Sequence, residues 1–365
     1  MAAPDVIRFA EKVIVLLDQG GFNATYKYAV LLGLMDLCFE KSARDGSPPE
    51  MVTTAELASK VVELYWHQTR KFGPLGGRAP LQNRGGQAEI LTMITRFREE
   101  HAPDPSATLF RAKLHARGRF EKLLKDVEWK LVEMPLPKLQ RVGRELDSFI
   151  YEIAWDDDIV RRTLTSPEFD NRIVFRPGAS RSLVDLAGVL RPLVHRHWLT
   201  HVTRLNRLPE SALEDFLFGI DRSALGPVCS PLFELQGGRC FYCAGAIRTK
   251  AQVDHFLPWA RHPDDGLANL VVAHDACNRH KSDFLADAGH LAAWTERVAR
   301  QAGSLREVAT QVRWPHEPQR TARVVRGVYR RLPDDVRLWH LENQFVRLDR
   351  AQLSSALAAL PEALA

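Results

Sequence analysis

Apolar residues recur at helical spacing along the N-terminal part of the chain. The runs VIRFAEKVIVLLDQ and ATYKYAVLLGLMDLCFEKSA are separated by Gly20 and Gly21, which should end the first helix. Two further helices are predicted from TTAELASKVVELYWHQ, where Thr53 and Glu56 form a capping box, and from QAEILTMITRFREE. Residues 1–125 are therefore predicted to be helical, either as a helix-turn-helix-like unit that reads DNA or as a plain helical bundle.

Residues 126–208 mix strand-like and helical patterns. DVEWKLVEMPLP and SFIYEIAWDD alternate polar and apolar residues as strands do, and RIVFRPGAS is typical of a short strand and turn. SLVDLAGVLRPLVHRHWLTHVTRLN predicts a long helix, which Pro192 should kink or interrupt. From Arg161 to Leu208 nine Arg oppose three acids, a net charge of +6. This part is predicted to be an α+β basic region.

The C-terminal part is again mainly helical. Residues 209–300 hold the short helix SALEDFLFGI, a stretch rich in Cys and His, and the helix LAAWTERVARQA. Residues 301–365 are predicted to form a basic helical region, with Arg320, Arg323 and Arg326 along one side of RTARVVRGVYRRLP. From residue 300 to residue 350 eleven Arg oppose six acids, a net charge of +5. Together these patterns predict an α+β fold that is predominantly helical.

The composition is that of an ordinary globular protein, with 365 residues of which 45% are hydrophobic and 26% charged. No apolar run reaches the length of a membrane span, so no membrane partner is expected. The N-terminus lacks the pattern of a signal peptide, which predicts a cytoplasmic location. The cysteine total of five is odd, which argues against a disulfide framework and favours metal chemistry.

The densest group of reactive side chains runs from residue 240 to residue 283. Cys240 and Cys243 form one pair with two residues between them, and His274 and Cys277 form another. Two such pairs about 30 residues apart have the spacing of a closed tetrahedral zinc site. The sequence therefore predicts that these four side chains bind a structural Zn²⁺, which cross-links a segment too short to have its own core.

An Asp-His pair, Asp254 and His255, lies between the two zinc pairs and is followed by NLV and by Asn278. The pattern CxxC…DHxxP…NLV…HxxCNxxK resembles that of the HNH endonucleases, over about 45 of the residues. The resemblance implies an embedded ββα-metal module with a structural zinc. It also implies that His255 is the general base, since an imidazole titrates near neutral pH.

The resemblance assigns roles to further residues. Asp254 and Asn278 would bind one catalytic Mg²⁺ or Mn²⁺ through hard oxygen ligands. Asn269, which the resemblance places in the catalytic set, would hydrogen-bond across the loop and hold His255 in orientation. Three residues that follow Asn278 on the same helix would contact substrate: Arg279, Lys281 and His280, the last as an alternative contact for metal or phosphate.

The predicted function is hydrolysis of phosphodiester bonds, most simply in DNA. The stretch from Cys240 to Asp283 carries five basic and five acidic residues, so the basic flanks at 161–208 and 300–350 are expected to hold the polyanion. One module holds one cleavage centre, so cutting both strands would require a homodimer, a partner subunit or two encounters. An RNA-cleaving effector nuclease and a non-catalytic, zinc-dependent nucleic-acid-binding protein stay open, and a role in restriction or anti-phage defence is a further prediction.

Overall fold

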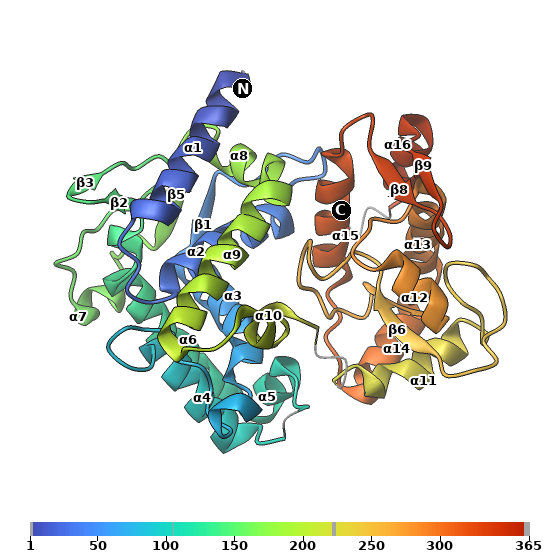
Figure 1. Cartoon of the computed structure of the whole chain (residues 1–365), viewed down its shortest axis with the longest axis horizontal. Helices are drawn as coiled ribbons and strands as arrows, with labels where there is room; N and C mark the ends of the chain where they lie inside the picture. The colour runs from blue at the N-terminus through green and yellow to red at the C-terminus, as the bar shows by residue number, and fades with distance from the viewer. Residues whose placement is uncertain (1–2, 105, 221–223, 361–365) are drawn as a thin grey trace. The chain divides into compact units, whose positions relative to one another are not determined.

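The computed structural model describes residues 3–104, 106–220 and 224–360, and Figure 1 labels its elements. The chain forms two compact units. The N-terminal unit consists of Met1–Phe39 and Ser47–Gly219, and the C-terminal unit of Glu40–Gly46 and Ile220–Ala365. The C-terminal unit is therefore discontinuous in sequence. The division into four regions at residues 125, 208 and 300 stays a prediction.

Helices dominate the N-terminal unit. Its α-helices are α1 (Ala3–Gln19), α2 (Tyr26–Glu40), α3 (Thr54–Trp66), α4 (Glu89–His101), α5 (Leu109–His115), α6 (Arg117–Glu133), α7 (Arg161–Leu164), α8 (Ala179–Asp185), α9 (Ala187–Asn206) and α10 (Glu210–Phe218). Short 3-10 turns cover His67–Thr69, Gly73–Leu75 and Leu136–Lys138. Helix α3 packs against α4 and α6. The predicted capping box is confirmed, because Glu56 Oε2 accepts from Thr53 N at 2.8 Å while Thr53 Oγ1 accepts from Glu56 N.

The strands of the N-terminal unit are short. A three-stranded antiparallel sheet has the order β1 (Met51–Thr53), β5 (Arg172–Phe175), β4 (Tyr151–Glu152), and β2 (Arg141–Val142) pairs with β3 (Glu145–Leu146). The predicted strands in SFIYEIAWDD and RIVFRPGAS are thus confirmed as β4 and β5.

One predicted strand and one predicted helix interruption were wrong, whereas a kink at Pro192 stays a prediction. DVEWKLVEMPLP belongs mostly to helix α6, because Val127 and Leu131 continue the buried face that Phe120 and Leu123 begin at helical spacing. Pro192 does not end helix α9, which is unbroken from Ala187 to Asn206. The interruption falls earlier, at Leu186 between α8 and α9. Pro192 lies in the second turn, where a proline forgoes one intrahelical hydrogen bond.

The C-terminal unit is built around a hairpin and the helix that follows it. Strands β6 (Gln252–His255) and β7 (Leu270–Ala273) pair antiparallel, with Asp254 opposite Val271 and His255 opposite Leu270. Helix α12 (Asp275–Lys281) follows β7 directly and packs on β6. This order of two strands and a helix is the predicted ββα arrangement. The predicted fold class, α+β with helices predominating, is likewise confirmed.

The remaining elements of the C-terminal unit supply its core. They are α11 (Gly226–Leu235), α13 (Ala288–Arg300), α14 (Ala302–Val312), α15 (Pro318–Arg330), β8 (Arg337–Trp339), β9 (Phe345–Arg347) and α16 (Arg350–Ala358). The Phe256 ring, just beyond β6, is stacked on Trp294 of α13 with centroids 5.1 Å apart, and on Tyr329 of α15 at 6.3 Å. The hairpin therefore buries its apolar side against helices from later in the chain.

Among the described residues, no helix is both long enough and apolar enough to cross a membrane.

Replacement of Trp294 should reveal how strongly the hairpin depends on α13. Its indole Nε1 donates to the Ala268 carbonyl at 2.8 Å, and its ring is fully buried. Trp294→Phe should keep the stacking but leave that carbonyl only the longer hydrogen bond from Arg297 Nη1, at 3.4 Å, at a cost of about 1 kcal/mol. Trp294→Ala should cost about 3–5 kcal/mol through the cavity it leaves. Urea unfolding followed by circular dichroism measures both; equal midpoints for the two variants would contradict this account.

Candidate active site and metal centre

The two predicted zinc pairs come together at one end of the hairpin. Cys240 and Cys243 lie in a tight turn closed by the Cys240 N–H, which donates to the Gly245 carbonyl at 2.9 Å. His274 is the N-cap of α12 and Cys277 lies in its first turn. The three sulfur atoms and a His274 ring nitrogen all lie within 4.8 Å of one another.

The chemistry of this cluster fits a zinc ion. His274 Nε2 lies 3.2 Å from the Ala246 carbonyl, which can only accept, so Nε2 carries the proton. Nδ1 is then unprotonated and lies 3.2 Å from Cys243 Sγ and 4.0 Å from Cys277 Sγ. Burial and the neighbouring Cys240 and Cys243 raise the pKa of the Cys277 thiol well above its usual value. A divalent cation would relieve this crowding of thiolates, and three sulfurs with one imidazole suit Zn²⁺.

Asp254 is held by one side chain that precedes the hairpin in the chain and one that follows it. Its Oδ2 accepts from the Tyr242 hydroxyl at 2.5 Å and lies 3.2 Å from the Lys281 ammonium. Burial and the nearby Asp254 charge hold the pKa of Tyr242 well above its usual value, so the phenol keeps its proton and donates. Within the part of the chain that the structure describes, no hydrogen bond occupies Asp254 Oδ1. This oxygen is available to a metal ion.

Lys281 is placed differently from the prediction. Its side chain is 0% exposed, and besides Asp254 its ammonium contacts the His255 carbonyl, to which it donates at 2.8 Å. A residue that contacts substrate phosphates must reach the surface, whereas Lys281 points into the unit because it is the counter-ion of Asp254. Lys281 ties α12 to the last two residues of β6, Asp254 and His255.

His255 is buried and paired with an acid that the sequence did not single out. Its side chain is 2% exposed, and Nε2 lies 2.9 Å from Asp265 Oδ1. Its ring meets Trp259 edge to face, with centroids 5.4 Å apart. The Asp265 carbonyl accepts from Trp314 Nε1 at 2.6 Å, which fixes the backbone that carries the carboxylate.

Asn269 spans the loop between β6 and β7. Its Oδ1 accepts from Leu257 N at 2.8 Å, and its Nδ2 donates to the carbonyls of Leu257 at 3.2 Å and Asp264 at 3.0 Å. Asn269 itself is fully buried. It holds the two ends of the loop together and so positions Asp265 beside His255. Among the described residues, its side chain makes no hydrogen bond to the imidazole itself.

The other predicted residues lie on α12. Asn278 is buried and falls one turn before Lys281 on the same helical face, which is the face that meets Asp254. Among the described residues, its carboxamide has no hydrogen-bond partner. Arg279 and His280 are exposed, and Arg279 is paired with Asp275 at 3.1 Å. Arg279 and His280 are therefore free to meet solvent, unlike Lys281.

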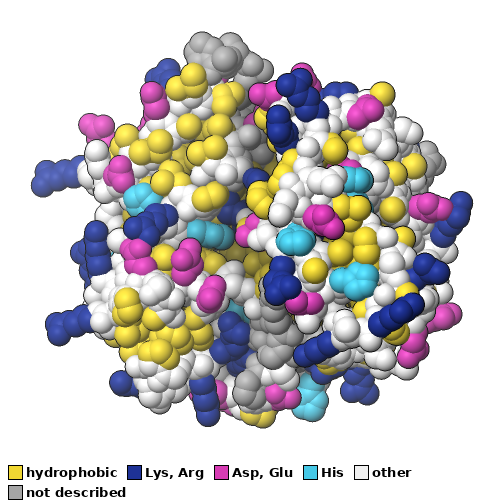
Figure 2. Space-filling view, turned by 45° about the vertical axis from the view of Figure 1, so that its right-hand side comes forward, with side chains coloured by type: hydrophobic (Ala, Val, Ile, Leu, Met, Phe, Trp, Pro, Cys, Tyr) yellow, Lys and Arg dark blue, Asp and Glu magenta, His cyan; other side chains and the backbone are white. Residues whose placement is uncertain are grey.

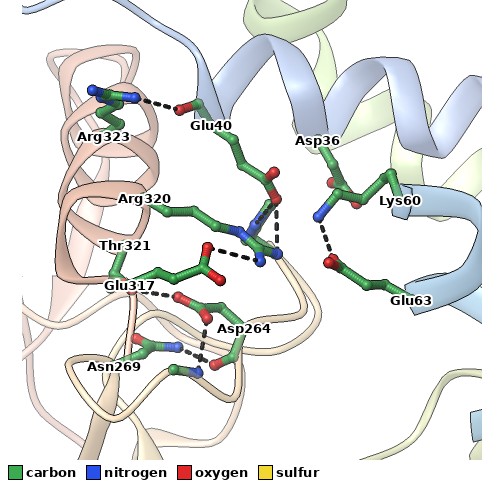
Figure 3. A network of polar contacts seen from close by, with 12 residues as sticks. Asp36, Glu40, Lys60, Glu63, Asp264, Asn269, Glu317, Arg320, Thr321 and Arg323 are labelled. Carbon is green, nitrogen blue, oxygen red and sulfur yellow. Dashed lines mark hydrogen bonds and ion pairs between the residues drawn. The ribbon is translucent and has the colours of Figure 1, made fainter. Parts of the chain in front are cut away.

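The active-site loop is also braced by α15 (Figure 3). Thr321 Oγ1 donates to Asp264 Oδ2 at 2.6 Å, and Asp264 Oδ1 accepts from Gly266 N at 2.8 Å. Arg320, one residue earlier, is paired with Glu40 at 2.9 Å. Figure 3 shows Glu40 and Asp264 approaching successive residues of the same helix.

The predicted basic side of α15 is turned inward. Arg320 pairs with Glu40, Arg323 donates to the Glu40 carbonyl at 3.5 Å, and Arg326 is buried. The basic stretch 161–208 is also largely neutralised, since six of its nine arginines are paired with carboxylates: Arg161, Arg172, Arg176, Arg181, Arg191 and Arg196. On the face drawn in Figure 2, Lys and Arg are interspersed with Asp and Glu rather than gathered in one patch.

Residues 240–286 match the family model of the HNH endonucleases. The match spans both zinc pairs, the hairpin and α12, so the predicted resemblance is confirmed for this segment, and the Cys and His cluster fits a zinc-binding subtype. No curated protein and no solved structure matches the chain. The assignment of residues 240–286 to an HNH domain therefore rests on the family match and on the geometry of the metal-binding cluster, the hairpin and α12.

Loss of a zinc ligand should lower the stability of the whole domain. Cys240→Ser is expected to lower the bound zinc by about one equivalent per chain and to lower the melting temperature, because binding of a structural zinc is coupled to folding. Cys229→Ser is the matched control, since Cys229 is a half-buried thiol outside the cluster. Zinc is measured by mass spectrometry and melting by circular dichroism. An unchanged melting profile for Cys240→Ser would contradict a structural zinc.

Proposed function

We propose that this protein is a metal-dependent endonuclease that hydrolyses phosphodiester bonds in DNA. The HNH match of residues 240–286 supports nuclease chemistry. The observation that carries the proposal is the buried His255, held through Nε2 by Asp265 and adjacent on β6 to Asp254, which faces α12. A general base, an oriented carboxylate and a helix bearing a second oxygen ligand are what such hydrolysis needs.

His255 is the proposed general base, and Nδ1 is the atom that accepts the proton. Asp265 Oδ1 can only accept from Nε2, so Nε2 bears the hydrogen and Nδ1 holds the lone pair. Nδ1 removes the proton of the attacking water, and the imidazole becomes a cation. The Asp265 carboxylate stabilises that cation and fixes the ring, as the acid of a catalytic triad does.

Asp254 and Asn278 are the proposed ligands of a catalytic Mg²⁺ or Mn²⁺. When bound, such an ion supplies positive charge for the phosphate and the leaving oxygen. Tyr242 and Lys281 bind Oδ2 of Asp254, so that Oδ1 is held toward the ion. Lys281 also offsets the charge of Asp254 when no ion is bound, which lowers the cost of burying the carboxylate.

Substrate contacts are proposed for the exposed end of α12. Arg279 and His280 lie there beside the active-site residues, and Arg279 can exchange Asp275 for a phosphate. Binding through these few contacts implies a substrate affinity that falls as the salt concentration rises. Cytoplasmic location, a homodimer or partner subunit, and a role in restriction or defence stay predictions.

His255→Ala should strongly reduce cleavage while the fold is kept. General-base catalysis contributes about 10²–10⁴-fold, so plasmid nicking in Mg²⁺ or Mn²⁺ should fall by that factor. Asp254→Ala should lose activity as well, and His115→Ala, which alters an exposed histidine of α5, should not. Supercoiled plasmid and a structured RNA are incubated in parallel and resolved on gels.

The outcomes of this assay separate the alternatives. Cleavage of RNA with plasmid left intact would replace the DNA substrate by an RNA substrate. If wild type and His255→Ala leave both substrates equally intact in every metal, the protein is a zinc-dependent binding protein and not an enzyme.

Asp265 should affect turnover more than substrate binding. Asp265→Asn keeps an acceptor for His255 but removes the charge, and Asp265→Ala removes both. A hydrogen bond to a charged group contributes about 1.5–3 kcal/mol, so kcat should fall by about 10- to 100-fold, with KM little changed. The control is Glu296→Gln, at an exposed carboxylate paired with Arg300 on α13. An equal fall in kcat for Asp265→Asn and the control would contradict this role.

A further inference from the structure

A second group of metal-binding side chains lies in the C-terminal unit, outside the zinc cluster and the active site. Asp287, His290 and His340 each place a ligand atom within 4.8 Å of the others. Asp287 Oδ1 lies 2.8 Å from His290 Nδ1, and Asp287 Oδ2 lies 2.7 Å from His340 Nδ1. One carboxylate therefore faces the Nδ1 atoms of two imidazoles.

The local fold places these three side chains together. Asp287 is the N-cap of α13, where Oδ1 accepts from His290 N at 2.9 Å, and His290 lies in the first turn. His340 follows β8 directly, and its N–H donates to the Gln344 carbonyl at 3.0 Å, which fixes the turn into β9. The cluster joins the start of a helix to a hairpin about 50 residues later.

The Tyr242 carbonyl determines which ring nitrogen of His290 carries the proton. Nε2 lies 3.0 Å from the Tyr242 carbonyl, which can only accept, so Nε2 must carry a hydrogen. A neutral imidazole has one N–H, and Nδ1 would then direct a lone pair at Asp287 Oδ1, only 2.8 Å away. Two lone pairs at that distance repel, so a cation must be shared between them, either a second proton on His290 or a metal ion.

We propose that Asp287, His290 and His340 bind a divalent transition-metal ion, distinct from the zinc cluster and from the catalytic ion. Two imidazoles and one carboxylate are a donor set for Zn²⁺ and related ions. A metal-bound histidine commonly donates its second ring N–H to a backbone carbonyl, as His290 does to Tyr242.

The charge of Asp287 and the solvent exposure of His340 are both compatible with a bound metal ion. Burial acts to raise the pKa of Asp287, but its hydrogen bonds with His290 and His340 lower the pKa to about 2, so the carboxylate is ionised at neutral pH. The side chains of Asp287 and His290 are buried, whereas that of His340 is 42% exposed. An ion can therefore enter from the side of His340, whose ring can turn to close the set.

The bound ion would hold the zinc-binding turn in place through His290. His290 would bind the ion through Nδ1, and its Nε2 donates to the carbonyl of Tyr242. Tyr242 belongs to the turn between Cys240 and Cys243. The rings of Tyr242 and His290 also both pack on Trp339, with centroids 5.1 Å and 5.6 Å away. The ion would thus cross-link α13, the residue that follows β8 and the zinc-binding turn.

Zinc stoichiometry tests this site. The full chain and its variants are dialysed to equilibrium against Zn²⁺, and bound zinc is measured by mass spectrometry. His340→Gln and Asp287→Asn should each bind about one zinc equivalent fewer than the wild type. Asn caps a helix as well as Asp does, so Asp287→Asn removes the charge and keeps the N-cap. Zinc should also raise the melting temperature of the wild type more than that of either variant.

The control is His115→Gln, an exposed histidine outside every cluster, which should bind as much zinc as the wild type. Circular dichroism establishes that the variants keep their helical content. The same zinc content in wild type, His340→Gln and Asp287→Asn would overturn the site. The shared cation would then be a proton on His290.

Discussion

The buried ion pair between Lys281 and Asp254 is the interaction on which the active site depends. Lys281 reaches Asp254 with its ammonium and at the same time donates to the His255 carbonyl, so one side chain from α12 fixes two adjacent residues of β6. Both partners are buried, and removal of either would leave a buried charge without its counter-ion, which costs about 3–5 kcal/mol. The distance between helix and strand is therefore tightly fixed.

Helix α12 is only two turns long, and such a helix has little stability of its own. It is held at both ends by tertiary contacts. His274 and Cys277 anchor its start in the metal-binding cluster, and Lys281 anchors its end on β6. Asn278 lies between the two anchors, so the position of its backbone is constrained on either side.

The sequence predicted what depends on spacing and missed what depends on distant partners. The helical face of α3, the two zinc pairs and the ββα order follow from local periodicity and ligand intervals. Tyr242 and Asp265 gave no such signal, because their roles arise from the folded path of the turn and loop that carry them. The environments of Lys281 and Arg320 were missed for the same reason: the partner of Arg320 is Glu40, which lies 280 positions earlier in the chain.

The position of Glu40 also limits how this protein can be dissected. The C-terminal unit includes the early segment Glu40–Gly46 besides the residues from 220 onward. In this segment, Glu40 supplies the carboxylate that pairs with Arg320, and the Gly46 carbonyl accepts a hydrogen bond from Arg331. A fragment that starts at residue 220 would contain every side chain proposed to bind metal or to act in catalysis, yet it would lack the Glu40 carboxylate that pairs with Arg320 and the Gly46 carbonyl that accepts from Arg331. A minimal version of the C-terminal unit should therefore carry residues 40–46 as well, for example by circular permutation or as a separate peptide.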